Sequence, residues 1–257
     1  MTFSGFIKYS IRSLFFKLGY DIKPRFNHES LADIDKEYLQ IINSIKNYTL
    51  TSPERMAALV NSVQYITQNQ ISGNIVECGV WKGGSMMLVA KMLLALNKTD
   101  YDLYLFDTFE GTTKPSKHDL DYLGNSMLEV WNKEFEGKSQ LPASADFVPL
   151  EEVKKNLFST GYPKEKIHFI QGNVENTIPK NAPEKISLLR LDADWYESTK
   201  HELNYLFPRL TSAGILIIDD YGHFKGSKKA VDEYFEKNKI SSFLFRIDYT
   251  GRLLVKS

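Results

Sequence analysis

Apolar and polar residues follow two spacing patterns along most of this chain. Short apolar runs are typical of buried strands, whereas apolar positions three to four residues apart are typical of amphipathic helices. Because the two kinds of segment alternate, we predict an α/β fold, a Rossmann-like, mostly parallel sheet with helices on both faces. The predicted strands are 74–80, 101–108, 166–172, 185–192 and 214–220, and the predicted helices are 31–48, 85–96, 150–158, 198–210 and 227–237.

Two further signals complete the predicted fold. Thr51-Ser52-Pro53-Glu54 combines a capping hydroxyl, a first-turn proline and a first-turn acid, so a helix should begin there and end before Gly73. Residues 243–248 and 252–256 flank Thr250-Gly251 and predict a C-terminal antiparallel hairpin, which brings the sheet to seven strands.

Two regions of the chain differ from this alternating pattern, the N-terminal segment and a long internal insertion. We assign residues 1–50 to an N-terminal helical extension and 51–257 to the α/β domain. Residues 1–20 form an amphipathic, basic segment, which would pack on the domain or a second subunit, or lie on a membrane surface. Residues 110–149 are far longer than an ordinary connection of about 4–6 residues, so they are a candidate lid over the site or a plain surface insertion.

Composition narrows the class of protein. The chain has 257 residues, with 32 Lys and Arg against 32 Asp and Glu, so a basic surface for nucleic acid is not expected. The single cysteine, Cys78, cannot form an internal disulfide or a cysteine zinc cluster. No apolar run approaches the roughly 20 residues of a membrane span. We expect a cytoplasmic protein, with peripheral membrane contact through residues 1–20 as the alternative.

Polar and acidic residues gather at the carboxyl ends of the predicted strands. In open parallel sheets, ligands bind beyond these ends. The first strand leads into a glycine loop, Glu77-Cys78-Gly79-Val80-Trp81-Lys82-Gly83-Gly84, which differs from the G-x-G-x-x-G pattern of NAD-binding folds. Its glycines allow close backbone approach, and a helix N-terminus follows. Asp107, at the end of the second strand, can accept both ribose hydroxyls of an adenosine group.

The loop lacks a phosphate-binding Lys-Ser/Thr pair, and no arginine cluster accompanies it. This favours an adenosyl cofactor that carries a sulfonium and no phosphate, so we predict S-adenosylmethionine; a tight turn beside a solvated acid is the alternative. The cofactor-binding residues predicted in the loop, at the start of the following helix and at the end of the second strand are Gly79, Trp81, Gly83, Ser85 and Asp107.

Four carboxylates, Asp192, Asp194, Asp219 and Asp220, follow two strands that should be neighbours. Carboxylates held together repel unless a cation compensates them, and a hard divalent cation such as Mg²⁺ prefers oxygen ligands. Such an ion could hold a vicinal diol and lower the pKa of a hydroxyl, and Asp194 could take its proton. The alternative is a turn that leads into a helix. We also expect Tyr196, Tyr221 and His223, close to these acids, to contact the substrate.

Five ordered motifs together resemble the macrocin O-methyltransferase (TylF-type) family. They are 51–55 (TSPER), 76–84 (VECGVWKGG), 106–111 (FDTFEG), 189–199 (LRLDADWYEST) and 218–221 (IDDY). The resemblance runs from about Thr51 to Lys237 and implies a class I methyltransferase fold, S-adenosylmethionine, Mg²⁺ and methylation of sugar hydroxyls.

By the same resemblance, Asp192, Asp219 and Asp220 would be the metal ligands and Asp194 the general base, with Asp192 also in the catalytic set. The residues that would hold the cofactor by this resemblance are Glu77, Gly79, Asp107, Gln171, Gly172, Asn173 and Val174. One departure is Asn173, where family members tend to carry an aromatic residue. We therefore expect an O-methyltransferase, a homo-oligomer, acting on a sugar hydroxyl of a glycoside or surface glycan. A small-molecule catechol-type O-methyltransferase and a catalytically inactive binding protein with this fold remain the alternatives.

Overall fold

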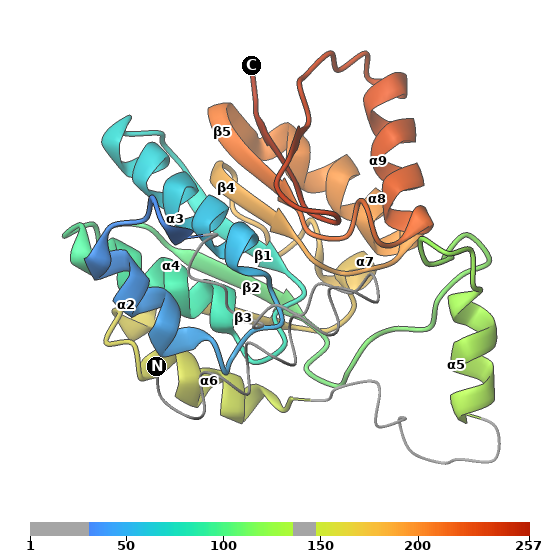
Figure 1. Ribbon diagram of the computed structural model, residues 1–257, viewed down its shortest axis with the longest axis horizontal. Helices are drawn as coiled ribbons and strands as arrows, with labels where there is room; N and C mark the ends of the chain where they lie inside the picture. Colours follow the sequence, from blue (N-terminus) through green and yellow to red (C-terminus); the bar gives the residue numbers. More distant parts are fainter. Residues whose placement is uncertain (1–30, 136–147) are drawn as a thin grey trace, which may run out of the picture.

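A seven-stranded sheet forms the centre of the molecule (Figure 1). The structure is a computed structural model and describes residues 31–135 and 148–257. The strand order is β3-β2-β1-β4-β5-β7-β6, in which β1 to β5 are parallel and β7 is antiparallel to both its neighbours. The strands are β1 (Asn74–Cys78), β2 (Leu103–Asp107), β3 (Ile167–Gln171), β4 (Ile186–Leu191), β5 (Leu210–Ile218), β6 (Phe245–Arg246) and β7 (Arg252–Val255).

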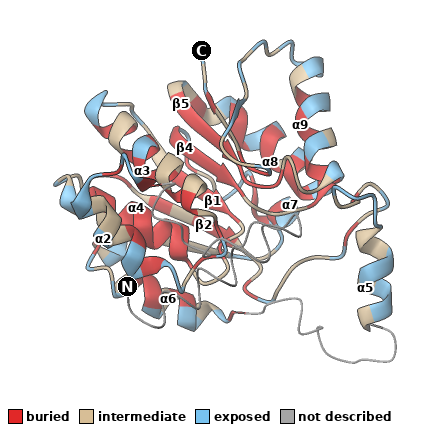
Figure 2. Cartoon of the chain, in the orientation of Figure 1, coloured by how far each residue is buried: buried red, intermediate tan, exposed pale blue. Residues whose placement is uncertain are grey.

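Helices cover both faces of the sheet, as the sequence predicted. The α-helices are α2 (Lys36–Ile45), α3 (Pro53–Gln68), α4 (Gly84–Ala95), α5 (Met127–Phe135), α6 (Leu150–Phe158), α7 (Val174–Thr177), α8 (Tyr196–Leu206) and α9 (Lys225–Lys237). One hydrophobic cluster joins the sheet to α2, α3, α4 and α6, and a second joins it to α7, α8 and α9. Figure 2 shows the buried strands between these two layers.

The strands are apolar on both sides because successive side chains enter opposite clusters. Leu188 of β4 belongs to the first cluster, whereas its neighbour Leu189 belongs to the second. Ile217 and Ile218 of β5 divide in the same way. This explains why the sequence shows continuous apolar runs rather than strict alternation, and it confirms the predicted fold class.

The boundaries of most helices and strands agree with the predicted ranges to within a few residues. Ser52 caps α3 as predicted, because its Oγ accepts a hydrogen bond of 3.1 Å from the Arg55 amide. The predicted helix 31–48 is α-helical only over Lys36–Ile45. The short helix α7 was not predicted, and neither was α5, inside the long insertion. The predicted N-terminal helix lies outside the described residues.

The first part of the insertion is tied to the starts of α8 and α9. Asp119 is fully buried, and its Oδ1 accepts a hydrogen bond of 2.8 Å from the Tyr196 amide. The Lys225 amide donates to the Leu120 carbonyl at 2.8 Å. Beyond these anchors, α5 stands away from the sheet, and none of its described side chains is buried (Figures 1 and 2). Among the described helices, none has the length and hydropathy needed to cross a membrane.

Candidate active site

A cavity of about 550 Å³ opens at the carboxyl ends of the parallel strands. This is where an open α/β sheet binds ligands, because the strand order reverses between β1 and β4. Residues 111–113 of the insertion and Val148 also line it. The cavity collects twelve of the predicted site residues: Gly79, Trp81, Ser85, Asp107, Gly172, Asn173, Val174, Asp192, Asp194, Asp219, Asp220 and His223.

The glycine loop passes close to β4, and this requires a residue without a side chain. Gly79 has φ +83°, and a Cβ placed there would lie 1.9 Å from the Asp192 carbonyl oxygen. A larger residue would therefore separate the loop from the strand that carries the acids. Gly83, with φ +84°, is the N-cap of α4, whose first turn carries no acidic side chain. The N-terminus of α4 thus meets the cavity through Gly84 and Ser85.

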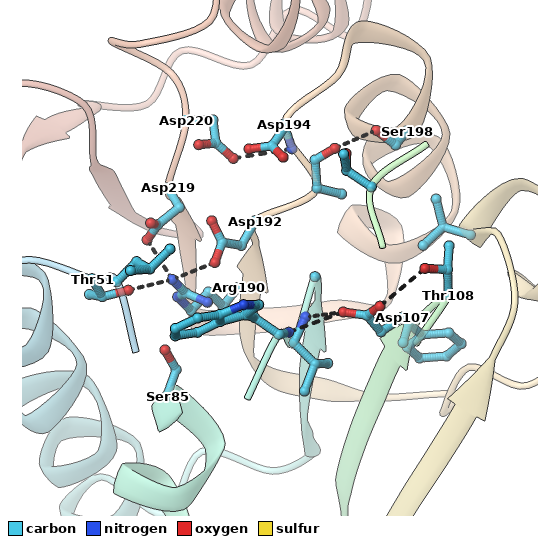
Figure 3. A pocket seen from close by; sticks show the side chains of 18 of the residues that line it. Thr51, Ser85, Asp107, Thr108, Arg190, Asp192, Asp194, Ser198, Asp219 and Asp220 are labelled. Carbon is cyan, nitrogen blue, oxygen red and sulfur yellow. Dashed lines mark hydrogen bonds and ion pairs between the residues drawn. The ribbon is translucent and has the colours of Figure 1, made fainter. Parts of the chain in front are cut away.

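Asp107 holds the glycine loop in place from the end of β2. Its Oδ2 accepts hydrogen bonds from the amides of Val80 at 2.6 Å and Trp81 at 3.1 Å, and its Oδ1 accepts one of 2.7 Å from the Phe109 amide (Figure 3). From the sequence, we predicted that this carboxylate binds the cofactor. In the structure it also fixes the shape of the loop that borders the cavity.

Four carboxylates come together on the rim formed by β4 and β5 (Figure 3). The two strands pair in parallel with Leu191 opposite Ile218, so the residues after each strand lie side by side. The Asp219 amide continues this ladder with a hydrogen bond of 2.9 Å to the Leu191 carbonyl. Burial, with the neighbouring Asp192 carboxylate, raises the pKa of Asp220 to about 7.

Asp194 adopts a backbone conformation that is uncommon for a residue with a side chain. Its φ is +63°, in the left-handed region. The conformation is supported by a hydrogen bond of 3.2 Å from the Asp194 amide to Oδ2 of Asp220. Burial, and then the Asp220 carboxylate, raises the pKa of Asp194 well above its ordinary value. A strained acid beside a second acid is typical of a functional position.

Two arginines, Arg55 and Arg190, reach this rim and were not predicted. The buried Arg190 guanidinium lies 2.8 Å from Oδ2 of Asp192 and 2.9 Å from Oδ1 of Asp219 (Figure 3). Arg55, from α3, is ion-paired with Oδ2 of Asp219. The sequence offered one signal: Arg190 and Glu77 are single charged residues within two apolar strands, and they prove to be direct neighbours in the sheet.

The rim has the donor chemistry of a site for a hard divalent cation. Asp219 Oδ1 is buried, and its partner is the ion-paired Arg190 Nη2 at 2.9 Å. Carboxylate oxygens are the ligands that Mg²⁺ prefers. Within residues 31–135 and 148–257, however, no three His, Cys, Asp or Glu side chains converge as a ready-made metal site. Arg55 and Arg190 form ion pairs with two of the four rim acids, Asp192 and Asp219.

Five predicted site residues lie outside the cavity lining. Glu77 is fully buried behind it, and its Oε1 accepts a hydrogen bond of 2.6 Å from Arg190 Nη1. Its place in the structure is therefore that of a positioning residue for Arg190. Gly83 faces the Leu157 side chain, which a Cβ at this position would meet. The Tyr196 hydroxyl donates a hydrogen bond of 2.6 Å to Glu233 Oε2. The remaining two are Gln171, at the end of β3, and Tyr221, which lines a neighbouring pocket.

Comparison with known proteins adds to this geometry. The family model described as Macrocin-O-methyltransferase (TylF) matches residues 43–256. The chain belongs to this family. Curated relatives of this TylF-family protein include the demethyldecarbamoylnovobiocin O-methyltransferase of Streptomyces niveus, which is 30% identical over 204 residues, covering 79% of this chain and 74% of that protein.

A second relative is the 8-demethyl-8-(2,3-dimethoxy-alpha-L-rhamnosyl)-tetracenomycin-C 4'-O-methyltransferase of Streptomyces olivaceus, 31% identical over 206 residues, with 79% of this chain and 74% of that protein covered. The solved structure of the O-methyltransferase NovP is 28% identical, covers 82% of both chains and superimposes with a TM-score of 0.71. The TylF-family protein is therefore an O-methyltransferase with the predicted fold. Family and fold support S-adenosylmethionine as its methyl donor.

Proposed function

We propose that this O-methyltransferase transfers a methyl group from S-adenosylmethionine to a sugar hydroxyl of a glycoside or surface glycan, with the help of a divalent cation, Mg²⁺. The observation that carries the proposal is the meeting of the glycine loop and the four-carboxylate rim at one cavity. The names of the relatives from S. niveus and S. olivaceus, an O-methyltransferase of demethyldecarbamoylnovobiocin and one of a rhamnosyl tetracenomycin C, support the proposal.

The cofactor half of the cavity is the side bordered by the loop and Asp107. The N-terminus of α4 and the left-handed Gly79 offer a backbone surface that an adenosyl group can approach closely. Asn173 and Val174, at the start of α7, border the same side. S-adenosylmethionine supplies an electrophilic methyl group on a sulfonium. The rim carboxylates would attract this positive charge, and the absence of a phosphate-type anchor in the loop suits it.

The acceptor half is bordered by the acidic rim, by His223 and by residues 111–113 of the insertion. In the reaction the hydroxyl oxygen forms a bond to the methyl carbon as the carbon–sulfur bond breaks, and the hydroxyl proton must leave. Asp194 is placed to receive it, because its carboxylate faces the cavity and its raised pKa makes it a stronger base than an ordinary aspartate. Residues 111–113 of the insertion would cover the acceptor.

Asp192, Asp219 and Asp220 would hold the cation. Arg55 would then have to release Asp219, and Arg190 would have to release Asp192 and Asp219. A divalent cation at this rim would lower the pKa of a bound hydroxyl. The repulsion between Asp192 and Asp220, which contributes to the raised pKa of Asp220, supports the assignment.

The test is transfer of a labelled methyl group to a panel of glycosides, catechols and polysaccharide extracts, with and without EDTA. Asp194→Asn is expected to lower kcat by about 10²–10⁴-fold while the Kd for S-adenosylmethionine is unchanged. The matched control is Asp102→Asn, because Asp102 forms its ion pair with Lys166 far from the rim. Activity that survives complete metal removal would reject the cation. Preferred methylation of catechols would reject the sugar acceptor.

A further inference from the structure

A second concave pocket lies beside the active-site cavity and is rich in cations. Its volume is about 330 Å³, and four of its lining residues are Lys225, Lys228, Arg246 and Arg252. Tyr249 lines both this pocket and the main cavity. We name these four residues the cationic pocket. It is built from the start of α9 and from the C-terminal hairpin, next to the anchored part of the insertion (Figure 1).

The charges of the cationic pocket are poorly compensated. Within the described part of the chain, Lys228 has an ion pair with Asp232, but Lys225, Arg246 and Arg252 have no carboxylate partner. The guanidinium groups donate to backbone carbonyls, Arg246 Nε to Asp248 at 2.9 Å and Arg252 Nη1 to Gly251 at 2.8 Å. Burial, with the like charge of Arg246, lowers the pKa of Arg252.

The start of α9 sharpens this imbalance. A helix N-terminus carries a partial positive charge and favours acids in its first turn. The first turn of α9 has no acidic residue and instead carries Lys225 and Lys228. Two carboxylates lie near this turn, Asp119 beside Gly226 and Asp232 in its ion pair with Lys228. The cations left for a multiply charged anion to engage are therefore Lys225, Arg246 and Arg252.

Aromatic side chains connect the cationic pocket to the active site. The rings of Tyr122 and His223 lie 5.4 Å apart, and the Tyr249 hydroxyl is 3.1 Å from Nδ1 of His223. Tyr122 and Tyr249 are both exposed. Aromatic rings with a polar edge suit a sugar ring, which presents both C–H faces and hydroxyls. A sugar lying on this group would have the acidic rim on one side and the cationic pocket on the other.

We propose that the cationic pocket binds the diphosphate of an activated sugar, so that the acceptor is a sugar diphosphate rather than a neutral glycoside. The inference rests on the proposed function and narrows its substrate class. A single carboxylate would engage one guanidinium, whereas a diphosphate offers enough oxygens for several of these cations. The other half of the diphosphate could carry a nucleoside or a lipid, since the pocket is open to solvent.

The first experiment is calorimetric titration of the full chain with inorganic pyrophosphate at low salt. The double variant Lys225→Gln/Arg246→Gln is expected to raise the Kd at least about tenfold. The matched control, Lys237→Gln/Lys239→Gln, removes two exposed charges near the end of α9, outside the pocket, and is expected to leave the Kd unchanged. No binding by the unmodified protein, or equal weakening in both variants, would overturn the proposal.

UDP and geranyl diphosphate then serve as competing probes for the two sources of the diphosphate. Tighter binding of one than of pyrophosphate assigns the nucleoside or the lipid, and equal affinities assign recognition to the diphosphate alone. A separate titration with S-adenosylmethionine distinguishes the failures. If calorimetry detects binding of S-adenosylmethionine but not of pyrophosphate, only this inference is rejected. If it detects binding of pyrophosphate but not of S-adenosylmethionine, the proposed function is rejected and the anion site stands.

Discussion

Replacement of Arg190 by methionine is the most informative perturbation of this molecule. The Arg190 guanidinium is buried, with 3% of its side chain exposed, and lies within 2.9 Å of three carboxylates, those of Glu77, Asp192 and Asp219. Methionine keeps much of the length and apolar volume of the side chain but removes the charge. The variant therefore leaves three acids around a site without their shared cation.

The expected loss can be worked from these distances. At an effective dielectric constant of about 20, two unit charges about 2.8 Å apart attract by roughly 6 kcal/mol. Desolvation of the buried groups offsets much of this, and removal of one partner from a buried ion pair typically costs about 3–5 kcal/mol. We expect Arg190→Met to lower the free energy of unfolding at pH 8 by about 3–5 kcal/mol.

The loss should depend on pH in a definite direction. Burial already raises the pKa of Glu77 to about 8, and removal of the guanidinium raises it further, because the guanidinium favours the charged carboxylate. A carboxyl whose pKa is higher in the folded state stabilises the fold at low pH, and this contribution is lost as the pH rises through the folded pKa. The loss at pH 5.5 is therefore expected to be smaller than the loss at pH 8.

Urea unfolding followed by circular dichroism at the two pH values measures both quantities. The control is Lys166→Met, which breaks a half-exposed ion pair with Asp102 and is expected to cost about 0–1 kcal/mol. A loss for Arg190→Met below about 1 kcal/mol at pH 8, or a loss that grows as the pH falls, would refute the idea that this arginine neutralises the rim.

Three further changes test other parts of the site. Gly79→Ala should lower the melting temperature and abolish S-adenosylmethionine binding, because the added Cβ would lie 1.9 Å from a backbone oxygen; binding equal to that of the unmodified protein in calorimetry would contradict this. Asp107→Ala should weaken S-adenosylmethionine binding at least about tenfold, because it removes three hydrogen bonds from backbone amides, two of them in the glycine loop; an unchanged Kd would argue against it. Asp119→Ala should speed proteolysis of residues 110–135 without altering cofactor affinity; unchanged cleavage would show the anchor to be dispensable.

The sequence by itself determined the fold and identified twelve of the residues that line the cavity. Continuous apolar runs alternating with amphipathic segments specify a parallel sheet covered on both faces, because only burial on both sides makes such strands favourable. The acids after β4 and β5 could be placed at one rim since neighbouring parallel strands end at the same edge. Gly79 and Asp107 followed from the same reasoning about strand ends.

Only the tertiary structure decided how charge is distributed around these residues. Arg55 lies far from Asp219 in the sequence, and Lys225 far from Arg246, so no local pattern shows that each pair shares a site. Glu77 occupies a strand position that points into the protein, toward Arg190, and only the packed sheet reveals that direction. Hydrophobic periodicity is a local property of the chain, whereas electrostatic compensation depends on distances that exist only after the chain has folded.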